Sequence, residues 1–490
     1  MKNLPVVNLG IVAVSRNCFP IKLSSDRRDA VVKALSGKGA KPIVTKTIVE
    51  TEKDVLAALD ELKQAKVNAL VVYLGNFGPE GPETMLAKKF DGPVMFVAAA
   101  EEDDLMNNRG DAYCGMLNAS YNIGLRGLRT YIPEYPVGTP DEVADMICEF
   151  VPIARALVGI ASLKIITFGP RPYDFLACNA PIKPLYDLGV EVQENSELDL
   201  FASYNAHKDD KRIDAVVEDM KRELGTGNNH PGVLPRLAQF ELTLLDWVEE
   251  NAGACDYVVL ASKCWPAFQT QFGFVPCYVN SRLAARGIPV ACETDIYGAL
   301  SEYILTAVTE APPTILDINN TVPKSMYEVH KKALDGYTQN DLFMGFHCGN
   351  TSACHLKNPE MRHQLIMKRA IEPDSEPDVT RGTLEGQFKP GAVTLFRLQS
   401  TADGILKSYI AQGEVKDVDP ESFGGIGVIA IPQMARFYRH VLVEDNYPHH
   451  TATTFCHAGK ALFGLMKMLG VCKVSYNQPA SLPYPTENPF

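Results

Sequence analysis

The chain has 490 residues, more than one compact domain usually holds, so two or three domains are expected. Hydrophobic residues make up 46% and charged residues 22%, which excludes a disordered chain, and no apolar run approaches the roughly 20 residues of a membrane-spanning helix. The net charge of −12, with no basic cluster, argues against a nucleic-acid partner.

The N-terminal apolar run at residues 5–14 has no small-residue cleavage site after it. It therefore predicts a first strand and not a signal peptide. The twelve cysteines include no CxxC pair and no regular framework, which predicts reduced thiols in a cytoplasmic protein.

The first 160 residues alternate between strand-like and helix-like patterns. Strands are expected at 7–14, 42–45, 67–74 and 93–98, and helices at 26–36 and 54–66. Alternation of this kind predicts an α/β domain with a parallel sheet. Residues 131–140 interrupt the pattern, and residues 141–161 predict a long linking helix.

A second α/β region begins at residue 163. It is expected to contain helices at 214–224 and 234–251 and strands at 257–262, 287–292 and 314–318. After about residue 320 the pattern changes to strands punctuated by glycine, at 393–399, 405–411 and 426–431. These strands predict antiparallel pairing and a β-rich last third.

The segment 287–320 is a predicted strand–helix–strand unit with an acidic residue at the end of each strand. Glu293 follows the first strand and Asp317 ends the second. If the strands are parallel neighbours, both acids lie about 5 Å apart at the sheet edge where ligands bind. Facing carboxylates repel unless a proton or a divalent cation lies between them. A turn-forming Asp317 and a solvated Glu293 explain the same residues about equally well.

Eight of the ten histidines come after residue 329. His347 stands in GFHCGN, the tandem pair His449 and His450 follows a proline, and His457 comes seven residues later. A single histidine is more often a packed or surface residue, but a tandem pair in a loop is harder to explain by packing. Two carboxylates with one or two imidazoles suit Mn²⁺ or a similar ion, and the cysteine spacing does not support structural zinc.

Other motifs are less informative. The glycine-rich stretches at 78–81 and 424–427 match no dinucleotide fingerprint, and neither a P-loop nor a GxSxG elbow is present. Cys264 could be a nucleophile, but a buried structural thiol is the favoured interpretation. Trp265 could form a platform for a sugar face, and core packing explains it equally well.

Five segments together carry a family resemblance. They are CETDIYGAL around Glu293, LDINN around Asp317, FHCGN around His347, YCGMLNAS at 113–120 and PHHTATTFCHAG at 448–459. In order and overall length the chain resembles the L-fucose isomerase and L-arabinose isomerase superfamily. Asp317 is similar to the fucose branch, whereas the His-His-Thr sequence and the His347 motif are similar to the arabinose branch.

The resemblance implies a Mn²⁺-dependent aldose–ketose isomerase with three domains. These are a Rossmann-like α/β domain at 1–162, a central α/β domain with the carboxylate pair at 163–320, and a β-rich, barrel-like domain with the histidines at 321–490. By analogy the chain forms a homo-oligomer, a trimer or hexamer, with shared pockets.

The resemblance also assigns residues. It implies Glu293, Asp317 and His450 as metal ligands, with His347 as a fourth and His449 as the alternative to His450. Glu293 and Asp317 are then the catalytic acid/base pair that moves a proton between C2 and C1 of the sugar through an enediol. Candidates for substrate contact are Trp265, Gln269, Phe77, Tyr113 and His449, and Phe19 joins Phe77 and Tyr113 as residues that could reach a neighbouring subunit's site.

Two other functions stay open at the level of sequence: a sugar lyase or hydrolase at the same metal site, and a non-catalytic sugar-binding protein. The metal between two carboxylates argues against the second. Arabinose, fucose and a C6-sulfonated hexose all remain possible substrates. A sulfonate requires a nearby cation, and Arg16, Arg27, Arg28 and Arg171 are the candidates.

Overall fold

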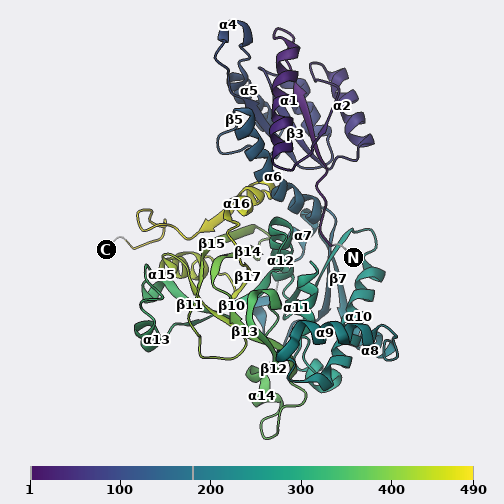
Figure 1. The fold of residues 1–490 in the computed structure, drawn as a ribbon, viewed down its shortest axis with the longest axis vertical. Helices are drawn as coiled ribbons and strands as arrows, with labels where there is room; N and C mark the ends of the chain where they lie inside the picture. The colour runs from purple at the N-terminus through teal and green to yellow at the C-terminus, as the bar shows by residue number, and fades with distance from the viewer. Residues whose placement is uncertain (1–2, 179–180, 489–490) are drawn as a thin grey trace. The chain divides into compact units, whose positions relative to one another are not determined.

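The computed structural model describes residues 3–178 and 181–488, and it divides into two compact units (Figure 1). One unit comprises Pro5–Gly159 with Lys460–Gly470. The other comprises residues 3–4, Ile160–Gly459 and residues 471–488. Among the described helices none is long and apolar enough to cross a membrane.

The unit that begins at Pro5 is built on a five-stranded parallel sheet in the order β2-β1-β3-β4-β5. Its strands are almost wholly apolar and buried, as expected when helices cover both faces of a parallel sheet. The strands are β1 (Leu9–Val14), β2 (Ile43–Val44), β3 (Ala69–Leu74), β4 (Val94–Ala99) and β5 (Val137–Gly138). The helices are α1 (Ile21–Gly37), α2 (Glu52–Gln64), α3 (Glu80–Lys89), α4 (Leu105–Asn108), α5 (Ala112–Leu125), α6 (Pro140–Ile160) and α16 (Gly459–Leu469).

The second parallel sheet has four strands in the order β7-β6-β8-β9. Its strands are β6 (Leu163–Gly169), β7 (Glu191–Ser196), β8 (Tyr257–Ser262) and β9 (Val290–Cys292). Its helices are α7 (Lys183–Asp187), α8 (Glu197–Ala206), α9 (Ile213–Leu224), α10 (Leu234–Asn251), α11 (Cys277–Ala285) and α12 (Ile296–Thr309). The sequence prediction of two α/β regions is thereby confirmed.

The third sheet is mixed and has nine strands in the order β12-β13-β16-β11-β10-β17-β14-β15-β18. An additional pairing of β15 with β16 closes six of these strands into a ring, which confirms the β-rich last third. The strands are β10 (Thr314–Thr321), β11 (Leu342–His347), β12 (Leu356–His363), β13 (Arg381–Phe388), β14 (Gly391–Ser400), β15 (Leu406–Lys416), β16 (Gly425–Ala430), β17 (His450–Thr454) and β18 (Lys473–Tyr476). Three short helices accompany them: α13 (Lys324–Val329), α14 (Leu365–Ile371) and α15 (Met434–Phe437).

The expectation that the strands of segment 287–320 are parallel neighbours is wrong. β9 belongs to the parallel sheet, whereas β10 pairs antiparallel with β11 and β17 in the ring. The physical reason lies in α12, which is mostly apolar and is buried on all sides from Ile296 to Val308. Because it packs against strands of both sheets, α12 carries the chain from one sheet to the other.

Candidate active site

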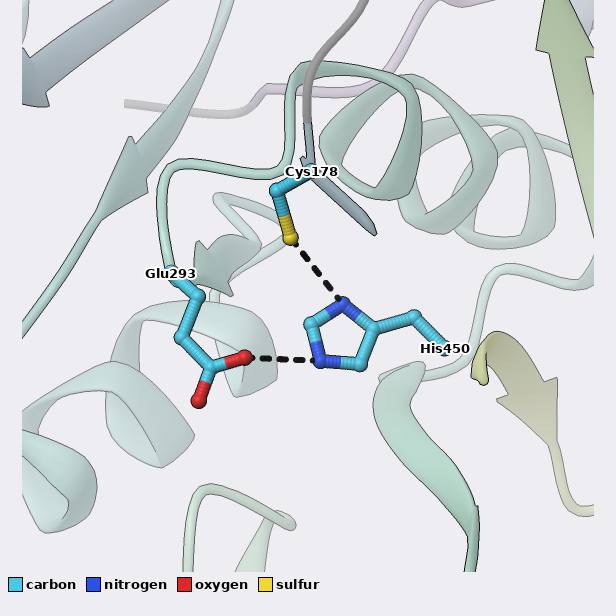
Figure 2. Close-up of side chains that lie close together, drawn as sticks. All are labelled: Cys178, Glu293 and His450. Carbon is cyan, nitrogen blue, oxygen red and sulfur yellow. Dashed lines mark hydrogen bonds and ion pairs between the residues drawn. The ribbon is translucent and has the colours of Figure 1, made fainter. Parts of the chain in front are cut away.

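The two predicted carboxylates both lie beside His450, and Figure 2 shows the contact of one of them, Glu293. Glu293 follows β9, Asp317 lies within β10, and His450 begins β17 directly opposite Asp317 in the antiparallel register. The Nε2 atom of His450 lies 3.0 Å from Glu293 Oε2 and 3.5 Å from Asp317 Oδ1. The acids are therefore brought together through a strand from the end of the chain and not through a common sheet edge.

These three atoms fit a divalent cation. His450 Nδ1 lies 2.9 Å from a carboxylate oxygen of Asp295, so Nδ1 carries the ring proton and Nε2 offers a lone pair. All three facing atoms are buried, and apart from their contacts with one another and with His449 Nε2 none has a hydrogen-bond partner among the described residues. Ligands about 2.1 Å from an octahedral ion lie about 3 Å from one another, which is near the two distances measured from His450 Nε2. Donor atoms within 4.8 Å of one another form two sets that share His450, one with Asp317 and His449 and one with Glu293 and Cys178. Oxygen and imidazole donors of this kind suit a divalent ion.

Without a cation, a proton takes its place. Burial alone would lower the pKa of His450, but its hydrogen bonds with Asp295, Cys178 and Glu293 raise that pKa well above the usual range. For Glu293, burial alone would raise the pKa, but the facing His450 holds that pKa below its usual value. Metal and proton therefore compete for the same Nε2 position.

An ion pair behind His450 holds the ring in place. Arg397 donates to both carboxylate oxygens of Asp295, at 2.5 and 2.8 Å, and all of these side chains are buried. Burial would raise the pKa of Asp295, but the charge of Arg397 keeps it below its usual range. Asp295 also caps α12 by accepting from the Gly298 amide. Asp295 therefore fixes the helix start and the tautomer of His450 together.

Cys178 lies beside the other nitrogen of the imidazole. Its sulfur is 3.8 Å from His450 Nδ1, whereas Glu293 faces Nε2 (Figure 2). Cys178, Glu293 and His450 form a candidate ligand cluster with one donor atom each. Burial raises the pKa of the Cys178 thiol, which disfavours the thiolate that a metal would bind.

The backbone at Glu293 is strained. Glu293 and Thr294 have φ values of 63° and 60°, a region that side chains with a Cβ rarely adopt and β-branched residues almost never. Such strain costs about 1–3 kcal/mol per residue and is found at functional sites. Here it aims the Glu293 carboxylate at His450 while Asp295, two residues on, caps α12.

The other two predicted histidines lie beside the cluster. The ring centroid of His347 is 6.0 Å from that of His450, and its Nδ1 accepts from the Cys348 amide. The proton of neutral His347 is therefore on Nε2, so a role as fourth ligand stays a prediction that requires this proton to leave. His449 lies 3.5 Å from Asp317 Oδ1, contacts Phe175 edge-on and lines a cavity of about 700 Å³.

Two of the predicted substrate contacts, Gln269 and Trp265, lie in the same unit as the carboxylates and pack against other side chains of that unit. Gln269 is fully buried and donates to Gln364 at 2.7 Å. Trp265 is half-buried and packs at the edge of the main hydrophobic core. Cys264 is buried and accepts from Gln364, in agreement with a structural thiol.

The remaining aromatic candidates belong to the unit that begins at Pro5. Phe19 and Phe77 stack with centroids 6.1 Å apart, and the Arg16 guanidinium lies 4.6 Å from the Phe77 centroid. Tyr113 is 58% exposed on α5. Their role at a neighbouring subunit's site stays a prediction.

The four predicted arginines differ in their surroundings. Arg27 is buried and binds Glu101 and Glu102, and Arg28 is buried and binds Asp29, so both serve the structure of their unit. Arg171 lines a cavity of about 380 Å³ together with Cys178 and Thr294.

Sequence reasoning missed Asp295, Arg397 and Cys178. A signal for one of them was present, because an arginine inside the apolar strand sequence VTLFRLQS requires a buried partner. No local pattern connects that arginine with Asp295, 102 residues earlier.

Two family models match this chain. The model of the fucose/sulfoquinovose isomerase N-terminal domain matches residues 10–161, and that of the L-fucose isomerase C-terminal domain matches residues 345–476. The second span contains His347 and His450. Glu293 and Asp317 lie between the two spans.

Full-length relatives extend the match across that gap. The chain is 23% identical to a sulfoquinovose isomerase of Priestia megaterium over 466 residues, covering 94% of this chain and 97% of the relative. It is 28% identical to a sulfoquinovose isomerase of Alkalicoccus urumqiensis, covering 66% and 68%, and 27% identical to one of a Clostridium species, covering 61% and 62%.

The family models and the relatives identify the class of protein as a sugar aldose–ketose isomerase. The chain belongs to the fucose/sulfoquinovose isomerase family.

Proposed function

We propose that the protein is a divalent-metal-dependent isomerase that interconverts a free aldose and its ketose by proton transfer through an enediol. The observation that carries the proposal is the approach of Glu293 Oε2 and Asp317 Oδ1 to His450 Nε2, at 3.0 and 3.5 Å in a buried site. Lone pairs that face one another in this way require a shared proton or cation.

Glu293, Asp317 and His450 would hold the metal, and Mn²⁺ suits their mixture of hard oxygens and one imidazole. The ion would act as a Lewis acid toward the neighbouring carbonyl and hydroxyl oxygens of the sugar. His347 would present its Nε2 proton to the same region.

We also propose that the chain forms a homo-oligomer. An exposed apolar stripe along α5 supports this proposal, and it consists of Tyr113, Leu117, Tyr121 and Leu125.

Glu293 and Asp317 would act as the acid/base pair. Because His450 lowers the pKa of Glu293, that carboxylate is ionised at neutral pH and can accept a proton. One carboxylate removes the proton from C2 and, after exchange with solvent, returns a proton to C1 on the same face of the enediol.

The relatives' names suggest the sugar to test first. Each of those described above is a sulfoquinovose isomerase. We therefore propose an aldohexose with a sulfonate at C6 as the substrate.

The test is proton NMR in D₂O with chelator-stripped protein and a panel of aldoses, before and after Mn²⁺ is added. We expect ketose only with metal, with solvent deuterium at the transferred position. Cleavage into two carbon fragments would replace the isomerase with a lyase. Unchanged sugars throughout the panel, despite metal binding, would overturn the proposal.

A further inference from the structure

A cavity of about 700 Å³ adjoins the candidate metal site. His449, which contacts Asp317, lines it, as does Ile318, the residue after Asp317. Its lining also includes Lys407, at the start of β15, and Tyr447. A sugar whose reacting end lies at Asp317 would thus extend its far end into this cavity.

Lys407 places a poorly compensated positive charge in the cavity. It is only 8% exposed, and of the described residues that line the cavity it alone bears a permanent charge. Its ammonium donates to the backbone carbonyl of Asp445, while the Asp445 carboxylate pairs with Lys473 at 2.6 Å. No described carboxylate lies within ion-pair distance of Lys407. A buried cation of this kind is stabilised by an anionic ligand.

Tyr447 adds a second recognition group. The Lys407 ammonium lies 4.8 Å from the centroid of its ring, which holds the flexible lysine stem in place. The Tyr447 hydroxyl is buried and has no hydrogen-bond partner among the described residues. A cation and an unused hydroxyl in one cavity match the needs of a tetrahedral oxyanion.

The sheet places Lys407 on the same face as the side chains that line the cavity. Gln399 on β14 lies opposite Lys407 in the register and accepts from Arg397, the partner of Asp295. Ile318 and His449 alternate with Asp317 and His450, which pair with each other and lie on the other face. The cavity therefore meets the metal cluster through His449, whose Nε2 lies 3.5 Å from Asp317 Oδ1.

We propose that Lys407 and Tyr447 form the subsite for a sulfonate or phosphate at C6 of the open-chain sugar. The proposal rests on the proposed function, because it takes the metal cluster as the position of C1 and C2. It assigns substrate selection to the β15 side of the cavity and not to any of the four arginines considered from the sequence.

The test separates binding from turnover. Calorimetry with Mn²⁺-loaded protein would compare hexitols, which cannot isomerise, that carry a 6-sulfonate, a 6-phosphate or no anionic group. The variants are Lys407→Met, Lys407→Arg and Arg171→Met. Lys416→Met is the matched control, because Lys416 lies on the same strand and also packs on a tyrosine ring, that of Tyr337, at 5.1 Å.

We expect wild-type protein to bind one of the two anionic hexitols at least 30-fold more tightly than the neutral hexitol. The anionic hexitol that binds more tightly identifies the anion. Lys407→Met should abolish this preference, Lys407→Arg should keep part of it, and Lys416→Met should match wild type. Loss of this preference in Lys407→Met supports the subsite even if the D₂O experiment yields no ketose. That combination of results would overturn the proposed isomerase activity and leave the anion subsite in place. An unchanged preference in folded Lys407→Met protein, no preference in wild type, or loss confined to Arg171→Met would overturn the subsite.

Discussion

Asp295 and His450 are 155 residues apart in sequence, yet Asp295 Oδ2 lies 2.9 Å from His450 Nδ1 inside the protein. The contact directs the lone pair of Nε2 toward Glu293 and Asp317. It also couples the metal ligand to α12, which Asp295 caps, and to Arg397. The orientation of the imidazole is thus built into the packing of the domain before any metal binds.

Replacing Asp295 with Asn should weaken metal binding about 10- to 100-fold, since the amide no longer enforces the Nδ1–H tautomer. Asn keeps the cap of α12 but leaves Arg397 without a countercharge, so stability should fall by roughly 3–5 kcal/mol. A competition titration with a metal-binding dye measures the first effect and chemical denaturation the second. Asp104→Asn, at the exposed cap of α4, is the control and should change neither. Wild-type metal affinity in the Asp295 variant would contradict the role assigned here.

Much of the fold was predictable because it depends on local pattern. Alternating apolar strands and amphipathic helices identify both parallel sheets, and the glycine-punctuated strands identify the ring. The pairing of β10 with β17 was not predictable, because it joins segments about 130 residues apart and no local pattern encodes it. For the same reason the sequence predicted that Glu293 and Asp317 lie together, but from a parallel pairing of their strands that the structure does not contain. Asp295 and Arg397 were missed because their roles depend on long-range contacts.

Metal should stabilise the protein, because the cluster exists only in the folded state. At a Mn²⁺ concentration 100 times the dissociation constant, unfolding should cost about 2.7 kcal/mol more than in chelator-treated protein. Asp317→Asn should remove this increment, because it replaces one of the proposed carboxylate ligands with an amide. Thermal melts with and without metal test this expectation. A metal increment that persists in the Asp317 variant would place the ion elsewhere.

Thr294→Gly should separate stability from activity. Glycine adopts a φ of 60° without strain, so the loss of buried side-chain contacts is offset and stability should stay within about 1 kcal/mol of wild type. The looser backbone should position the Glu293 carboxylate less accurately and lower kcat about 10-fold. Thr306→Gly, at a regular position inside α12, is the control and should cost about 2 kcal/mol or more. Equal destabilisation by the two substitutions would show that the Thr294 backbone stores no strain.

A pH-dependent stability is expected from Glu83 on α3, whose side chain is fully buried with both carboxylate oxygens unpartnered among the described residues. Burial, with a smaller effect of Glu80, raises its pKa from 4.5 to about 8. An acid with a raised folded-state pKa favours folding below pH 4.5, and this contribution is lost as the pH rises to about 8. Glu83→Gln should therefore match wild type near pH 4.5 and be more stable by a few kcal/mol at pH 9, since each pKa unit is worth about 1.4 kcal/mol. Urea denaturation of both proteins between pH 4.5 and pH 9 measures the difference, and a constant difference across that range would mean that Glu83 does not titrate inside the fold.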